Sequence, residues 1–82
     1  MTKEFKEYIR SLSLEQLNRR LGFTKEALDR ENRAIDRMEK KADEYKAYGW
    51  GRSYPVEYLP TVHQAAELED EVNFIKAEIA LR

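Results

Sequence analysis

The residues best suited to acid–base or metal chemistry lie in the C-terminal third of the sequence. They are the only histidine, His63, and an acidic cluster made of Glu67, Glu69, Asp70 and Glu71. Residues three and four positions apart share a helical face, so Glu67 can point the same way as Asp70 and Glu71. Carboxylates grouped in this way can hold Mg²⁺ or another hard cation.

A metal-dependent enzyme of this kind, such as an all-α nucleotide pyrophosphatase, also needs a second acidic pair on a neighbouring helix. Glu39, Asp43 and Glu44 offer one, but Lys40 and Lys41 stand among them. The histidine lies in the first turn of an expected helix, and the chain has no cysteine for it to activate. We therefore expect no catalytic residue, no metal and no cofactor, and an acidic cluster that is solvated beside an apolar seam.

The segment from residue 45 to residue 58 has the most unusual composition, because it holds five of the nine aromatic residues. Tyrosine, tryptophan and arginine are enriched among the residues that dominate binding energy at interfaces, so we expect a protein partner here. The expected contact residues are Tyr48, Trp50, Arg52, Tyr54 and Tyr58. Two alternatives stay open. The rings, with Val56 and Leu59, close the end of a helical hairpin, or they bind a small molecule or nucleotide by stacking.

Residues 17–31 resemble a helix-turn-helix motif. Gly22 matches the turn glycine, Phe23 the apolar residue after it, and Thr24 the start of the recognition helix. Leu28 matches a core position of that second helix. The resemblance implies a DNA-binding regulator that places the second helix in the major groove.

Two positions depart from this motif. Asn18 stands where helix packing requires a small residue, and Glu31 stands at the next core position. The face turned toward DNA carries few positive charges for contacts with phosphates. It consists of Lys25, Glu26, Asp29 and Arg30. The alternative for Gly22 is a kink within one long helix.

Composition predicts one domain, residues 1–82, outside any membrane. No apolar run approaches the roughly 20 residues that span a bilayer, and the charged N-terminal segment lacks the apolar stretch of a signal peptide. Without cysteine there is no disulfide, so we expect the cytoplasm of a cell or of a virus-infected host. Charged residues make up 38% of the chain, but the net charge of −1 does not fit a nucleic-acid-binding domain.

Caps and helix-breaking residues predict an all-α fold. The expected helices span residues 2–10, 13–48 and 61–82, with a kink or break at 22–24 and a loop at 49–60. Thr2 is placed to cap the first helix. Two capping boxes, Ser13 with Gln16 and Thr61 with Gln64, are expected to start the second and third helices.

Apolar residues at coiled-coil spacing predict that the second and third helices form an antiparallel hairpin. In the second helix this seam consists of Leu14, Leu17, Leu21, Leu28, Ile35, Met38, Ala42 and Tyr45. One register sets Lys41 beside Glu71, and a shift by one heptad sets Glu39 beside Lys76. Exposed charge pairs contribute too little to choose between them, whereas burial of apolar side chains favours the first register.

In either register the third helix is too short to reach the start of the second helix. Leu14, Leu17 and Leu21 therefore need another cover. The first helix can fold back over them with Phe5 and Ile9, or a second copy of the chain can cover them. Both remain open, and we expect a homo-oligomer with the three leucines as its seam.

These patterns favour a short N-terminal helix plus a long helical hairpin that serves as a non-enzymatic interaction or assembly module. The expected partner is a larger protein that the module binds and modulates. In size and composition the chain resembles the small inhibitors and assembly factors that phages carry. A helix-turn-helix regulator and a small-molecule or nucleotide binder are the alternatives.

Overall fold

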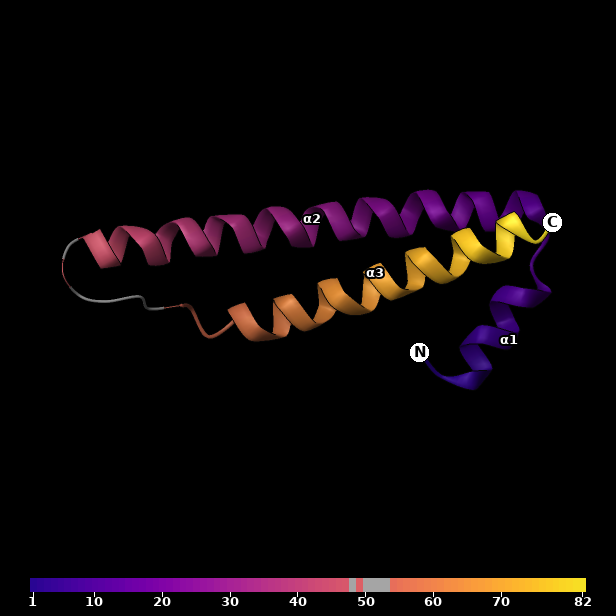
Figure 1. The fold of residues 1–82 in the computed structure, drawn as a ribbon, viewed down its shortest axis with the longest axis horizontal. Helices are drawn as coiled ribbons and strands as arrows, with labels where there is room; N and C mark the ends of the chain where they lie inside the picture. Colours follow the sequence, from indigo (N-terminus) through magenta and orange to yellow (C-terminus); the bar gives the residue numbers. More distant parts are fainter. Residues whose placement is uncertain (48, 50–53) are drawn as a thin grey trace.

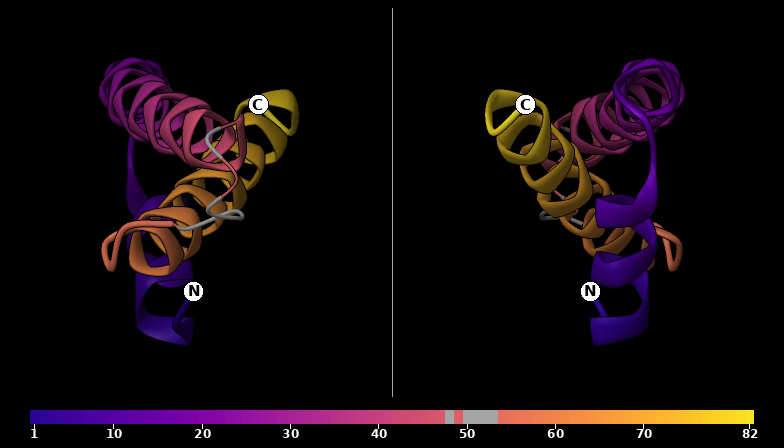
Figure 2. Two further views of the ribbon diagram at one scale, coloured as in Figure 1. Left: turned by 90° about the vertical axis from the view of Figure 1, so that its left-hand side faces the viewer. Right: turned by 90° about the vertical axis from the view of Figure 1, so that its right-hand side faces the viewer.

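The computed structural model describes residues 1–47, 49 and 54–82. This part of the chain is all-α, as predicted, and forms three helices without a strand: α1 (Lys3–Ser11), α2 (Leu14–Ala47) and α3 (Tyr58–Ala80). Figure 1 shows α2 and α3 side by side and antiparallel, with α1 near the C-terminal end of α3. Figure 2 shows that α1 is steeply inclined to both. None of the described helices is long and apolar enough to cross a membrane.

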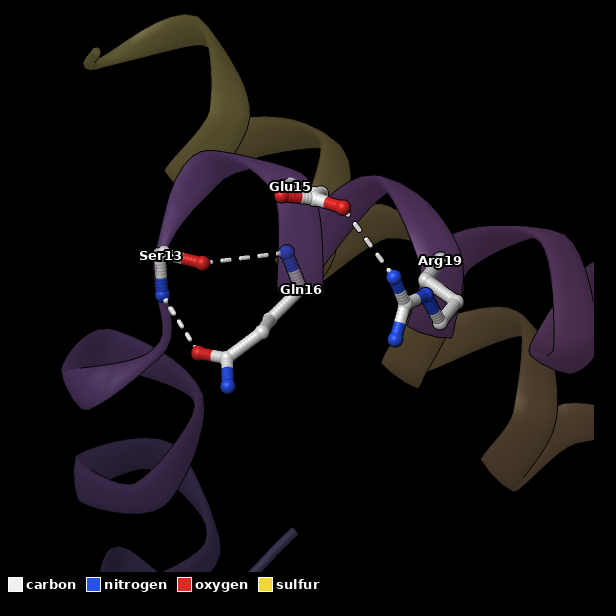
Figure 3. A network of polar contacts seen from close by, with 4 residues as sticks. All are labelled: Ser13, Glu15, Gln16 and Arg19. Carbon is white, nitrogen blue, oxygen red and sulfur yellow. Dashed lines mark hydrogen bonds and ion pairs between the residues drawn. The ribbon is translucent and has the colours of Figure 1, made fainter.

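Side-chain caps set the starts of the first two helices. The hydroxyl of Thr2 accepts a hydrogen bond from the backbone N–H of Phe5 at 3.1 Å. Ser13 and Gln16 form the predicted capping box (Figure 3): the Ser13 N–H donates to the Gln16 side chain at 2.9 Å, and the Gln16 N–H donates to the Ser13 hydroxyl at 3.2 Å. Each cap satisfies backbone donors that a helix start leaves without partners.

The second predicted capping box is wrong, because α3 begins at Tyr58, before Thr61. Thr61 lies inside the helix, where its hydroxyl donates to the carbonyl of Glu57 at 2.6 Å instead of capping. Pro60 is accommodated because the first turn of a helix requires no backbone N–H donor at that position. A proline that marks a boundary in the sequence therefore lies within the first turn of α3.

The helix α2 continues through Gly22, so neither a break nor a helix-turn-helix is formed over residues 17–31. Gly22 has no positive φ angle, and nothing lies within 4 Å of the position that a Cβ would occupy. Gly49, just beyond α2, has a φ of 81° and needs the conformational freedom of glycine.

These two glycines give opposite expectations for alanine substitution. We expect Gly22→Ala to raise the free energy of unfolding by about 0.5–1 kcal/mol, because alanine favours the helix interior and meets no clash. Gly49→Ala should lower it by about 1 kcal/mol, because a side chain is strained at positive φ. Thermal unfolding at low protein concentration measures both, with about 4–8 °C per kcal/mol. A lower melting temperature for Gly22→Ala would contradict a regular helix at this position.

The register of the hairpin differs from both predictions. Glu71 contacts Arg20 and Thr24, several turns closer to the start of α2 than Lys41. This shift brings Ile75 against Leu17, and both side chains are fully buried. Burial of apolar side chains does decide the register, as expected. It does so through Leu17 near the start of α2, which both predicted registers leave uncovered.

Of the two covers proposed for the leucines near the start of α2, the one within the chain is formed. Ile9 of α1 packs with Leu17 and Ile75 in the core. Leu21 is partly buried against this core, and Leu14 remains 46% exposed. Leu17 is therefore not available as the seam of an oligomer, and only Leu14 of the predicted seam is substantially exposed.

Polar contacts help to fix α1 on the hairpin. Arg10 forms an ion pair with Glu78 of α3 at 3.3 Å. The guanidinium of Arg82 donates to the backbone carbonyls of Arg10 and Leu12. These carbonyls lie at the end of α1, where a helix leaves acceptors without partners and favours a positive charge.

Candidate functional site

Of the predicted contact residues, Tyr54 and Tyr58 lie at the end of the hairpin that is remote from α1. Tyr48, Trp50 and Arg52 are outside the described residues. Tyr54 and Tyr58 stack, with ring centroids 4.3 Å apart. The Tyr58 hydroxyl also donates to the Glu39 carboxylate at 3.0 Å. The two described tyrosines are thus partly engaged with each other and with α2, as expected if rings close the end of the hairpin.

Two neighbouring apolar residues are instead turned toward solvent. Val56 is 86% exposed and Leu59 is 65% exposed, so neither contributes to closing the hairpin. Tyr54 is 38% exposed despite its stacking on Tyr58. We call residues 54–59 the hairpin tip. Three exposed large apolar side chains within this short segment are an interaction signal. The sequence pattern indicates Tyr54 as a contact residue but assigns Val56 and Leu59 to closing the hairpin.

A cavity of about 390 Å³ lies beside the tip. It is lined by Lys41 and Tyr45 of α2 together with Tyr54 and Pro55. Tyr54 and Pro55 therefore lie beside the last turns of α2. This position agrees with the register, because α3 is displaced toward the start of α2.

A second concave surface, which we call the α1 groove, opens where α1 meets the hairpin and has a volume of about 400 Å³. Tyr8 of α1, Arg20, Phe23 and Ala27 of α2, and Leu68 of α3 line it. Tyr8 is 51% and Phe23 is 66% exposed. The sequence does not indicate this groove, since its two rings come from different helices and Phe23 falls at the expected kink or break over residues 22–24.

Arg20 forms an ion pair and two cation–π contacts in the α1 groove. Its guanidinium lies 2.9 Å from the Glu71 carboxylate and 5.2 Å from the centre of the Phe5 ring. The Tyr8 ring is 5.7 Å away. Arginine over aromatic rings is attractive, so Arg20 connects all three helices. Its charge is already matched by Glu71, and the pair is better suited to fixing the walls of the groove than to chemistry.

The acidic cluster of α3 is not joined by the acidic pair that a metal enzyme would need. Glu71 lies at the level of Arg20, whereas Glu39 lies at the level of Tyr58. Along α3 these two levels are separated by about 20 Å, at roughly 1.5 Å per residue. Within the part of the chain that the structure describes, no group of three or more metal-ligating side chains is found. His63 is exposed on α3.

Comparisons with protein-family models, curated proteins and solved structures give no match to this chain. The hairpin tip and the α1 groove are the two candidate binding surfaces of the described residues.

Proposed function

We propose that this protein is a non-enzymatic interaction module that binds a larger protein partner through the hairpin tip. The main support for this proposal is the exposure of Val56 and Leu59, at 86% and 65%, in a segment that also contains Tyr54. Exposed apolar side chains that lie together mark interaction surfaces, and tyrosine, tryptophan and arginine are the residues that concentrate binding energy there. The adjoining sequence supplies further residues of this type, Tyr48, Trp50 and Arg52.

The structure offers a mechanism for presenting this surface. The stack of Tyr54 on Tyr58 and the hydrogen bond from Tyr58 to Glu39 hold one side of the tip against α2. Val56 and Leu59 then project on a supported backbone, which lowers the entropy cost of ordering the surface on binding. A cytoplasmic location and an accessory role of the phage type belong to the same proposal.

The experiment compares the removal of exposed apolar side chains at the two ends of the molecule. The chain is used to capture partners from the cells that produce it, and the captured protein is purified and titrated by calorimetry. We expect Val56→Ser with Leu59→Ser to weaken binding at least about tenfold. Leu81→Ser, at the opposite end and 80% exposed, serves as the control and should bind as the parent does. Equal affinities for both variants would place the contact surface elsewhere.

Alanine substitutions at Trp50 and Arg52 extend this test. If these side chains contact the partner, binding is lost while the circular dichroism of the helices is unchanged. If they close the end of the hairpin instead, helicity falls together with binding. The two readouts separate an interface from internal packing.

The cavity beside the tip favours a small-molecule or nucleotide binder as a second candidate. Tyr54 supplies a ring for stacking, and Lys41 supplies a positive charge beside it. Titration of isotope-labelled protein with ATP tests this function. Saturable shifts confined to Lys41, Tyr45 and Tyr54 would support it, and unchanged spectra would remove it.

A further inference from the structure

Phe23 lies where the α1 groove meets the outer face of α2, next to Gly22, which has no side chain. Phe23 is 66% exposed in the middle of a regular helix. Gly22 precedes it, and open space surrounds the position of its absent Cβ. A glycine weakens a helix interior, so its presence here is explained if another group approaches the backbone closely. A flat aromatic ring is a suitable group for such an approach.

Four exposed charged residues flank this face in a self-complementary order. Glu15 and Arg30 lie at equal distances on the two sides of the bond that follows Gly22, and so do Arg19 and Glu26. Their spacings of four, seven and four positions keep them along one side of the helix. When a second α2 helix runs antiparallel to the first about this point, each acidic residue of one helix therefore lies opposite a basic residue of the other.

We propose that this face of α2 packs against the same face of a second copy of the chain, with the two α2 helices antiparallel. The twofold axis passes between Gly22 and Phe23. In this arrangement Phe23 covers Gly22 of the second copy, and the reverse contact occurs by symmetry. The inference concerns a different surface from the hairpin tip and does not depend on the proposed function.

The charges specify the direction of this pairing. Glu15 faces Arg30 of the second copy, and Arg19 faces Glu26 of the second copy, so symmetry gives four attractive contacts. A parallel pairing would set each of these charges against its own copy and is disfavoured. Arg19 now bonds Glu15 within its own helix at 3.1 Å. Figure 3 shows both side chains on the surface of α2, with α3 passing behind it.

The exposed area of this elongated chain is large enough for an interface of standard size. The accessible surface is 6149 Å² for a mass of 9.8 kDa. A compact monomer of this mass exposes about 5,200 Å². The excess of roughly 1,000 Å² is close to the surface of about 800 Å² that each partner buries in an interface of standard size. The open α1 groove beside Phe23 contributes to this excess.

Charge reversal with rescue tests the pairing. Sedimentation equilibrium from micromolar to millimolar protein should show a dimer for the parent chain. Arg19→Glu and Glu26→Arg should each raise the dissociation constant about tenfold, because each turns two attractions into repulsions. The double variant restores opposite charges and should return to near the parent value. Lys25→Glu, on another face of the helix, is the control and should leave the dissociation constant unchanged.

Truncation of the ring tests the apolar part of the contact. Phe23→Ala should raise the dissociation constant about a hundredfold while keeping the helical circular dichroism of the parent. A parent chain that stays monomeric at millimolar concentration overturns the proposal. A dimer that persists in Phe23→Ala, or that the double charge variant fails to restore, also overturns it and moves the contact to another face.

Discussion

Leu17→Ala is expected to lower the free energy of unfolding by about 2–5 kcal/mol. Leu17 is fully buried and lies between Ile9 of α1 and Ile75 of α3, so its truncation leaves a cavity that both helices line. A chain of this size has about 4–12 kcal/mol of stability in total. The substitution therefore removes a large part of it. Urea unfolding followed by circular dichroism measures the effect.

Leu14→Ala is the matched control for this experiment. It removes the same atoms from the same helix one turn earlier, but Leu14 is 46% exposed. We expect less than about 1 kcal/mol for it. Equal losses at the two positions would show that the leucines are covered in another way, for example by the second copy that the sequence left open.

Ile9→Ala is expected to release α1 from the hairpin at a cost of about 2–4 kcal/mol. Ile9 is the fully buried side chain of α1, and it covers Leu17 and Ile75. The contacts of Arg10 with Glu78 and of Arg82 with the end of α1 are exposed to solvent and contribute less. Ile9 is therefore the main apolar anchor of α1, and Phe5 and Leu12 pack beside it only partly buried.

Hydrogen exchange distinguishes this release from global unfolding. In Ile9→Ala the amides of α1 should exchange much faster, while the central amides of α2 and α3 keep most of their protection. Glu7→Ala, at an exposed position of the same helix, should leave exchange unchanged. Uniform loss of protection in all three helices would mean that α1 and the hairpin form one cooperative unit.

The sequence predicted those features that depend on neighbouring residues. The caps at Thr2 and at Ser13 with Gln16 form as expected, because each requires only a side chain and a backbone group one turn away. Thr61 shows the limit of such signals. The same pattern occurs there, but α3 begins earlier, and the hydroxyl bonds back to Glu57.

The register and the sites could not be predicted in the same way. Flanking charges are worth too little to set a register, and no spacing in the sequence fixes how far α3 is displaced along α2. The α1 groove follows from the register, because it needs Tyr8 and Leu68 on either side of Phe23. The aromatic composition did identify the tip, but it did not show that Val56 and Leu59 face solvent.

Because α2 is unbroken, the molecule is long and narrow, and a dimer would hold its two tips at a fixed spacing. The chain is 54 Å long and only 21 Å by 15 Å across. The tip contacts α2 at Glu39 through Tyr58, and from Phe23 to Glu39 the helix spans about 24 Å, at roughly 1.5 Å per residue. Two copies joined near Phe23 would point their tips in opposite directions, about 50 Å apart. A target that repeats its binding site at this spacing gains avidity, whereas more closely spaced sites engage one tip at a time.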